Sequence, residues 1–527
     1  MKNLFVLFST FYFAVFSLFG QENVLYFEVQ QAKKGNGNFE NAFLEEVNAE
    51  LIASKKFINP DEVYFFGNIS LDVKQNQSKA INLVMPLKSE NITLELIEAP
   101  ESFYRYEVMT SSGKKFPANK DIKHYRGIVK GKENSLVAIT FYEDEIIGLI
   151  CTDEGNFNLV KDYQSGKHLF YNERNLIEKS NMTCGTIDDF TLSYDPEVLL
   201  KQRNIMSEDS SVVRTRIIDK IVGFYVETEY DIYQTRGNIS SVEAYIAGLF
   251  NQVAVLYLNE DIFTYVSRLY IWDANDPYTG TNLTPLLSQF QTIRTSIIGD
   301  MGILLTFRNI GGGLAARYSG LCNVPTDKRL AVAKLKNHDI IGPIYSWSVY
   351  VVTHELGHLF GSRHTHACVW NGDNTAIDGC PGYTENTVLD IPYGNCPVPA
   401  KPPAGTIMSY CSEDDEDGID FILGFGHQPG NVIRNNVANA NCLNPCNPIY
   451  FTNQTVTQED NNISCSDILV QNVTVTNGAT LTLKAVGNID VQVVIVKNNS
   501  KLILDAGGEV NIISEFEVEL GSEFEIK

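Results

Sequence analysis

The chain of 527 residues is too long for a single hydrophobic core, which predicts two to four domains. Hydrophobic residues make up 44% of it and aromatic residues 11%, a composition that excludes a largely disordered protein. Its 64 acidic and 41 basic side chains give a formal net charge of −23, which argues against non-specific binding to nucleic acid or to an anionic membrane.

The N-terminal segment 1–20 has the pattern of a secretory signal peptide. Lys2 precedes an apolar stretch from Leu4 to Phe19, and Gly20 offers a small residue at the cleavage point. A retained membrane anchor is the alternative interpretation. We find no later stretch with the apolar length that crossing a bilayer requires, so the mature protein is expected to be secreted and not to span a membrane.

Residues 21–213 are predicted to form a β-rich unit. Four stretches alternate between apolar and polar residues and are bounded by turn-forming residues, as expected of strands. They read INLVMPL, ITLELIE, SLVAITFY and IIGLICT. The polar stretch at 201–213 is then interpreted as an exposed linker that proteases can cut.

A mixed α/β domain is predicted from residue 214 to 446. The spacing of apolar residues predicts strands at 216–230, 262–273 and 301–307, and helices at 240–260, 285–297 and 345–360. Beyond the last helix Gly, Pro, Asn and Cys are frequent, so irregular loops linked by disulfides are expected there.

Ten cysteines in an exported chain predict disulfides. Cys151 and Cys184 lie in the first half of the chain. The remaining eight are even in number, so they could pair among themselves. These eight are Cys322, Cys368, Cys380, Cys396, Cys411, Cys442, Cys446 and Cys465.

The C-terminal part, 447–527, repeats a pattern of strand, tight turn and strand. Gly478, Ser500 and Ser522 recur at a constant spacing, and VTVTNGATLTL, VIVKNNSKLIL and FEVELGSEFEI surround them. Such a period with β alternation predicts stacked rungs of a short β-solenoid. A small sandwich or meander is the alternative.

Residues 354–364, HELGHLFGSRH, carry a chemical signature, HExxHxxGxxH. His354 and His358 are four residues apart, so on a helix both imidazoles leave the same face and can share one metal ion. Gly361 permits a backbone turn with positive φ, which ends the helix and brings His364 round as the third ligand. Three nitrogen ligands leave one position of a tetrahedral zinc open, which is the mark of a catalytic site.

Glu355 follows the first histidine and is predicted to be the general base. It would hydrogen-bond a zinc-bound water without becoming a ligand itself. Zinc lowers the pKa of bound water to about 7, and Glu355 would take the proton and later deliver it to the leaving amine. The motif therefore predicts hydrolysis of peptide bonds in protein or peptide substrates.

With this motif and the stretch GTIMSYC at 405–411, the chain resembles the metzincin clan of zinc peptidases. Within that clan it resembles bacterial relatives of the adamalysin/reprolysin family, over about residues 120–446. The resemblance implies a five-stranded mixed sheet, a zinc-binding helix and a small irregular subdomain. It makes Met408 the methionine of a Met-turn below the imidazoles. The stretch GGGLAARYSGLCN resembles the edge strand along which a peptide substrate lies.

The resemblance also extends to residues before the linker. The stretch 124–150 resembles the end of a reprolysin-type propeptide, and NMTCG at 181–185 is similar to a cysteine switch. The thiolate of Cys184 would then occupy the open zinc position and keep a zymogen inactive. A disulfide between Cys184 and Cys151 is the alternative. Residues 21–213 are accordingly interpreted as a propeptide with its linker.

Two positions depart from the adamalysin pattern. Thr365 follows the third histidine, where that family commonly has an acidic residue. Tyr410 stands two residues after the methionine, as in astacins and serralysins, where such a tyrosine approaches the zinc or the oxyanion; a packed core tyrosine is the alternative. His366 and His427 are interpreted as loop histidines, because three ligands suffice.

The sequence thus predicts a secreted multidomain zinc endopeptidase with a β-rich propeptide, an α/β metzincin catalytic domain and a C-terminal all-β, solenoid-like domain. The acidic run 413–417 supplies oxygen ligands that suit Ca²⁺, and a solvated loop is the alternative. The C-terminal domain would attach to a cell surface, matrix or glycan, or cap the enzyme. A surface adhesin with a vestigial peptidase domain is the alternative function, and the intact ligands, base and methionine argue against it.

Overall fold

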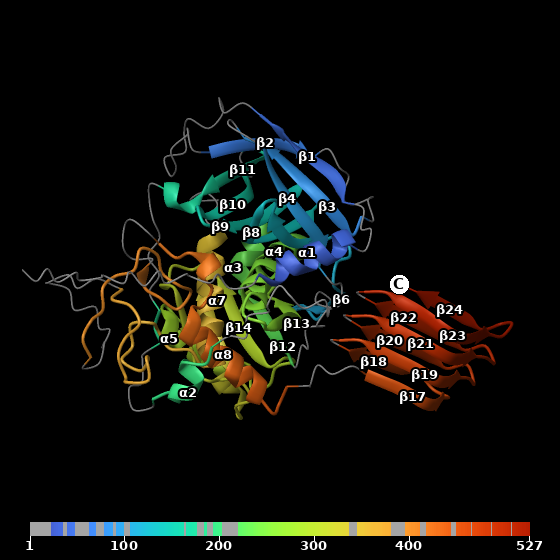
Figure 1. Ribbon diagram of the computed structural model, residues 1–527. Coiled ribbons are helices and arrows are strands. Elements are labelled where there is room, and N and C mark those ends of the chain that lie inside the picture. The colour runs from blue at the N-terminus through green and yellow to red at the C-terminus, as the bar shows by residue number, and fades with distance from the viewer. Residues whose placement is uncertain are drawn as a thin grey trace, which may run out of the picture.

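The computed structural model describes most of the chain from residue 23 onward (Figure 1). The described residues are 23–34, 39–47, 63–69, 78–87, 91–99, 106–162, 165–176, 184–186, 193–202, 220–336, 345–380, 396–411, 418–443, 449–464, 466–485, 487–506 and 508–526. The predicted signal peptide, the acidic run at 413–417, Cys446 and Cys465 lie outside these residues. A barrel, a central sheet with helices and a C-terminal pair of sheets follow one another along the chain.

The N-terminal strands close into a β-barrel of order β1-β2-β11-β10-β9-β8-β7-β4-β3, drawn in blue to teal in Figure 1. Its strands are β1 (Glu40–Glu46), β2 (Val63–Ile69), β3 (Ala80–Pro86), β4 (Asn91–Glu98), β7 (Lys123–Val129), β8 (Lys132–Tyr142), β9 (Glu145–Thr152), β10 (Gly155–Asp162) and β11 (Lys167–Asn172). Neighbours are antiparallel except β1 and β3. Helix α1 (Val24–Lys34), which the sequence did not predict, packs against β4 and β7. The β-rich character predicted for this region is confirmed.

Strand β8 shows how the barrel joins the rest of the molecule. Val137 and Ile139 lie in the apolar interior of the barrel, whereas Leu136 and Ala138 lie in the large core that also contains the central sheet and its helices. Successive side chains of a strand point to opposite faces, so β8 is buried on both sides. The barrel and the central part therefore share one hydrophobic core.

The central sheet has the order β15-β16-β14-β12-β13-β5-β6. Its strands are β12 (Ile221–Thr228), β13 (Phe263–Ile271), β14 (Met301–Thr306), β15 (Gly313–Ala315), β16 (Leu330–Lys334), β5 (Glu107–Thr110) and β6 (Lys115–Pro117). All pairs are parallel except those of β15 with β16 and of β5 with β6. The predicted mixed sheet is confirmed, with β15 at one edge. Unexpectedly, β5 and β6 come from the region interpreted as a propeptide and extend the sheet beyond β13.

Helices cover this sheet on both faces. They are α3 (Tyr230–Arg236), α4 (Ile239–Leu258), α5 (Leu283–Ile293), α7 (Tyr345–Phe360) and α8 (His427–Asn439), with the short α2 (Pro196–Leu199) and the 3₁₀ turns η4 (Glu173–Asn175), η5 (Thr326–Arg329) and η7 (Phe421–Leu423). Helix α4 is long and apolar enough to cross a membrane by length and composition alone, although the sequence analysis singled out no such stretch. It is 83% buried inside the protein, between the sheet and barrel strands β8 and β9, as expected of a core helix.

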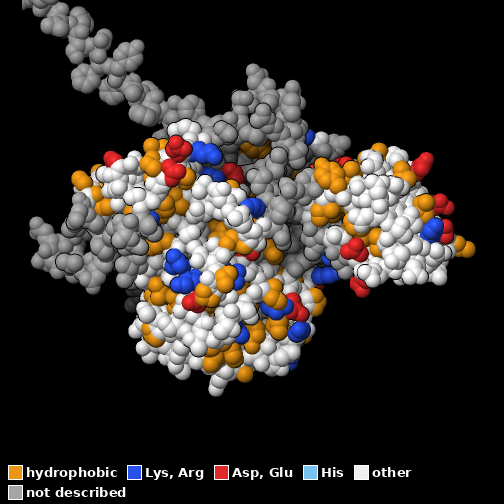
Figure 2. Space-filling view, turned by 90° about the horizontal axis from the view of Figure 1, so that it is seen from below, with side chains coloured by type: hydrophobic (Ala, Val, Ile, Leu, Met, Phe, Trp, Pro, Cys, Tyr) orange, Lys and Arg blue, Asp and Glu red, His pale blue; other side chains and the backbone are white. Residues whose placement is uncertain are grey.

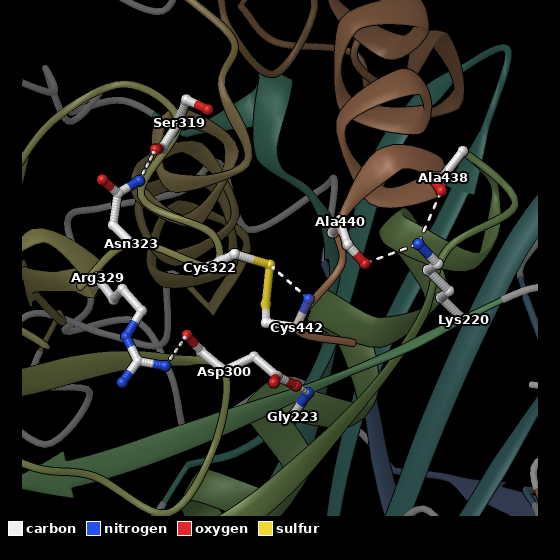
Figure 3. The surroundings of a disulfide bond; sticks show 10 residues. All are labelled: Lys220, Gly223, Asp300, Ser319, Cys322, Asn323, Arg329, Ala438, Ala440 and Cys442. Carbon is white, nitrogen blue, oxygen red and sulfur yellow. Dashed lines mark hydrogen bonds between the residues drawn. A yellow bond between two sulfur atoms is a disulfide. The ribbon is translucent and has the colours of Figure 1, made fainter. Parts of the chain in front are cut away.

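Three disulfides lie among the described residues, all in the region where the sequence predicted them: Cys322–Cys442, Cys368–Cys396 and Cys380–Cys411. The first links the segment after β15 to the chain just beyond α8 (Figure 3). Beside it, Lys220 donates from Nζ to the carbonyls of Ala438 and Ala440 at 2.8 and 2.7 Å. The start of the central sheet and the end of α8 are thereby held together.

The C-terminal part consists of two four-stranded parallel sheets, drawn in red in Figure 1, of order β17-β19-β21-β23 and β18-β20-β22-β24. The strands are β17 (Ile449–Val456), β18 (Asp460–Ser464), β19 (Ile468–Val475), β20 (Thr480–Ala485), β21 (Ile489–Val496), β22 (Lys501–Ala506), β23 (Val510–Val518) and β24 (Glu523–Ile526). Successive strands alternate between the sheets, and their apolar side chains form a core that contains only residues of this part. Figure 2 shows acidic, basic and apolar side chains interspersed over the described surface of one face.

Candidate metal centre

Helix α7 carries the first half of the predicted site. His354 and His358 leave it on one face, with ring centroids 4.7 Å apart, and both are fully buried. The helix ends at Phe360, and Gly361 has a φ of 113°, as predicted for the turn after the helix. The turn brings His364 to the same place, with its Nε2 atom 3.2 Å from that of His358.

The two imidazoles of the helix are oriented by backbone carbonyls. Nδ1 of His354 lies 2.7 Å from the Ile407 carbonyl, and Nδ1 of His358 lies 2.8 Å from the Ser362 carbonyl. These contacts leave the Nε2 atoms to face the centre of the cluster. Burial, and next the neighbouring His354, lower the pKa of His364 well below its usual value, so its imidazole is neutral, as a metal ligand must be.

Cys184 completes a group of four donors. Its Sγ lies 3.4 Å from Nε2 of His358, and the donor atoms of Cys184 and the three histidines all lie within 4.8 Å of one another. In a tetrahedral zinc site neighbouring nitrogens are about 3.3 Å apart, and nitrogen and sulfur about 3.5 Å. The observed spacings of 3.2 and 3.4 Å fit this geometry. Three imidazoles and a thiolate are ligands that zinc prefers.

The described residues include both Cys184 and Cys151 as free cysteines. The alternative interpretation, a disulfide between them, is therefore wrong for this structure. Cys151 lies on barrel strand β9, whereas Cys184 makes an isolated parallel bridge to Gly313 of the edge strand β15. The amide of Gly185 also donates to the carbonyl of Gly313 at 2.8 Å. The segment 184–186 thus lies along β15, in the position that the sequence analysis assigned to a substrate.

Met408 lies against helix α7 and is fully buried. A Cβ atom at Gly357, between the two helical histidines, would lie 2.8 Å from the Met408 sulfur, so this close approach requires glycine. The carbonyl of Met408 accepts from the amide of Thr365 at 3.1 Å. The turn that carries Met408 therefore supports the helix and the residue after the third histidine.

Glu355 is fully buried beside the histidines and next to the edge strand. The hydroxyl of Thr186 lies 3.5 Å from its Oε2 and accepts from the amide of Ala315 at 3.0 Å. Burial raises the pKa of the Glu355 carboxyl to about 8, and hydrogen bonds from Cys184 and Thr186 lower it in part. A dication among the histidines would lower it further.

Tyr410 lies at the site, not in a remote part of the core. Its ring centroid is 4.6 Å from that of His364, and its hydroxyl donates to the carbonyl of Cys184 at 3.4 Å. His366 stacks on His364 with 5.0 Å between ring centroids, and its ring also lies 4.8 Å from that of Tyr410. It is fully buried, but it is not one of the clustered donors. His427 is the first residue of α8, so its interpretation as a loop histidine is wrong, and it also lies outside the group of clustered donors.

Asp378 is a residue that the sequence analysis missed. Its carboxyl is buried, which raises its pKa, while hydrogen bonds with Thr365, the Cys380 amide and Ser409 act in the opposite direction. It therefore joins the residue after the third histidine to the residue after Met408. Thr365 departs from the adamalysin pattern because it lacks a carboxylate, and Asp378 places one beside it. No sequence spacing indicated this, since Asp378 lies in the irregular loop after the zinc motif.

Comparison with known families supports this interpretation of the site. Residues 219–419 match the family model Reprolysin_5, described as metallo-peptidase family M12. This segment is similar to a reprolysin-like metallopeptidase domain. The M12 family implies protein substrates and a catalytic zinc, and the histidine cluster is compatible with such a zinc.

Two solved structures similar to this chain show only weak overall likeness. Metalloproteinase-II from Bacteroides fragilis is 11% identical over 57% of this chain and 88% of its own, with a TM-score of 0.33. A chaperone-substrate complex is 12% identical over 55% of this chain and 38% of its own, with a TM-score of 0.24. We draw no conclusion from likeness at this level. No curated protein matches the chain.

Proposed function

We propose that the protein is a secreted, zinc-dependent endopeptidase of the metzincin type that is made as an inactive precursor. The observation that carries this proposal is the convergence of His354, His358, His364 and Cys184 beside the buried carboxyl of Glu355. When bound there, zinc would supply a Lewis acid for the peptide carbonyl and an acidified water. Residues 21–213 serve as the propeptide, with a signal peptide at 1–20 before it.

Within this proposal the residues of the chain have separate roles. Glu355 takes a proton from the attacking water on its carboxylate and delivers it to the leaving amine. The edge strand β15 binds an extended substrate through backbone hydrogen bonds, as it now binds residues 184–186. Tyr410 turns its hydroxyl from the Cys184 carbonyl to the carbonyl oxygen of a substrate.

Cys184 keeps the precursor inactive, because its thiolate occupies the position that water needs. The C-terminal part, 447–527, is a short β-solenoid that attaches the enzyme to a cell surface, matrix or glycan. Its separate core supports an independent role. The adhesin alternative is less well supported, because the ligands, the base and Met408 all lie together.

The test uses the full chain, since the barrel shares its core with the catalytic part. A Cys184→Ala variant should cleave an unfolded, labelled protein, and a zinc chelator should abolish the cleavage. The double variant with Glu355→Ala should bind zinc in equal amount and lose about 100- to 10,000-fold in turnover. Normal turnover without Glu355, or none in Cys184→Ala with zinc fully bound, would contradict the proposal.

A further inference from the structure

A half-buried tyrosine from the N-terminal region, Tyr194, packs at the C-terminal end of helix α7. The hydroxyl of Tyr194 donates to the Gly361 carbonyl at 2.7 Å and accepts from the Arg363 amide at 3.0 Å. Gly361 and Arg363 belong to the segment that joins His358 to His364. Both hydrogen-bond partners of the Tyr194 hydroxyl therefore lie within the predicted zinc motif.

The ring of Tyr194 is held as specifically as its hydroxyl. It packs against Trp370 with 4.8 Å between ring centroids, and the Arg363 guanidinium lies 4.9 Å from its centroid. Trp370 is fully buried and donates from Nε1 to the His364 carbonyl at 2.8 Å. A tyrosine side chain suits this place because its hydroxyl hydrogen-bonds the Gly361 carbonyl and the Arg363 amide. Its ring packs against Trp370 and makes a cation–π contact with the Arg363 guanidinium.

The residues that follow Tyr194 pack against helix α8. Helix α2 packs against α8, and Leu199 is fully buried beside Trp370 and Val432. The side-chain amide of Asn431, on α8, donates to the carbonyls of Leu199 and Lys201, both at 2.9 Å. We call residues 194–201 the anchor segment. It follows Cys184 in the sequence and ends at Lys201, the first residue of the predicted cleavage linker.

We propose that Gly361, Arg363 and Trp370 form a tyrosine-binding site, and that Tyr194 in this site keeps Cys184 over the zinc ligands after the linker is cut. This inference rests on the proposed function and extends its regulation. A cut in the linker leaves Cys184 and the anchor segment on the same fragment, so every contact described above persists. Activation then requires a second event that releases Tyr194 from its site.

The experiment uses the full chain with a recognition site for a sequence-specific protease placed in the linker. The chain is compared with the variants Tyr194→Phe, which removes only the hydroxyl, and Tyr194→Ala. Tyr450→Ala is the matched control, because Tyr450 is 67% exposed in the C-terminal part. Cleavage of a labelled unfolded protein is followed before and after the linker is cut.

The parent chain and the Tyr450→Ala control are expected to stay inactive after the cut. We expect Tyr194→Phe to gain activity about tenfold faster than the parent, because a buried carbonyl and amide lose their partner, and Tyr194→Ala to gain it faster still. Prompt activity of the parent at the rate of Tyr194→Ala would overturn the proposal.

A second readout does not depend on activity. Hydrogen exchange at the Arg363 amide should be slow in the cut parent chain and about tenfold faster in Tyr194→Phe, with no change in Tyr450→Ala. Equal exchange in the parent and in Tyr194→Phe would refute the tyrosine site. If Cys184→Ala is inactive before and after the cut, the peptidase proposal fails, and the exchange rates still decide whether Tyr194 is held.

Discussion

Gly313, the first residue of the edge strand, touches the general base of the proposed reaction. A Cβ atom there would lie 2.5 Å from Oε1 of Glu355, so any side chain must displace the carboxyl. In the Cys184→Ala background we expect Gly313→Ala to bind zinc normally and to lose about 100-fold in turnover, because the proton acceptor is moved. Turnover and zinc content measured on the same sample check this. Unchanged turnover would show that Glu355 tolerates the shift.

Asp378 is expected to matter for metal binding without touching the metal. Its buried carboxyl joins Thr365 and Ser409, which flank the third ligand and the Met-turn. We expect Asp378→Ala to weaken zinc binding by about tenfold, because the chain segments that follow His364 and Met408 lose the carboxyl that joins them and the ligands are held less firmly. Competition with a chelator measures this affinity. Asp373→Ala, an exposed change in the same loop, should leave it unchanged.

The convergence of His354, His358 and His364 was predictable, because their spacing along one helix and the turn after it brings the three imidazoles together. Met408 was predictable only through a resemblance, since nothing local places it below the helix. Gly313, Asp378 and Tyr194 were not found, because their roles depend on contacts between segments far apart in the sequence. Cys184 was identified as a zinc ligand candidate with a disulfide as the alternative, and the structure excludes that disulfide.

Helix α4 meets the N-terminal region through a buried carboxyl. Glu243 accepts from the Asn119 amide at 2.7 Å, and burial raises the pKa of its carboxyl from its usual value of 4.5 to about 7. The folded protein therefore holds this proton more tightly than the unfolded chain. The stability that the protonated Glu243 carboxyl contributes is fully present below its pKa in the unfolded chain. This contribution is lost as the pH rises through its pKa in the folded protein, about 7.

We expect the free energy of unfolding to fall, relative to Glu243→Gln, by up to about 1.4 kcal/mol per pH unit across this window. Urea unfolding of both proteins between pH 4.5 and 7.5 measures the difference. The exposed Glu143→Gln should show the slope of the unchanged protein. If the difference in unfolding free energy between the parent and Glu243→Gln does not change with pH, the raised pKa of Glu243 is contradicted.

Elements with a clear apolar period were predicted well, and elements that depend on tertiary contacts were not. The zinc-binding helix was predicted at 345–360, where α7 lies. Helix α8 was missed because its asparagines and Gly430 disfavour a helix in isolation. Its burial of Val432 and Ile433 and the ion pair of Arg434 with the buried Glu260 stabilise it in the fold.

At the scale of the whole molecule, the two flanking regions relate differently to the catalytic part. The C-terminal core contains no residue from elsewhere, whereas the barrel shares its core with helices α4 and α7. We expect a chain without 447–527 to keep its melting temperature within about 2 °C. A chain without 23–202 should not yield a soluble monomer. Calorimetry measures the melting temperature of the first chain, and size-exclusion chromatography shows whether the second is a soluble monomer. Equal effects of the two deletions would contradict the view that only the N-terminal region shares its core with the central part.

The pairing of β5 with β13 also governs the order in which the chain folds. Glu107 and Arg268, which bridge the two strands, are 161 residues apart, so β5 leaves the ribosome long before its partner exists. The barrel hairpins involve neighbouring segments and can form early, whereas this pairing must wait and makes folding slow. Lys115 and Pro117 on the outer strand β6 discourage other chains from adding there in the meantime. We therefore expect the central sheet to gain its β5 edge only after the barrel hairpins have formed.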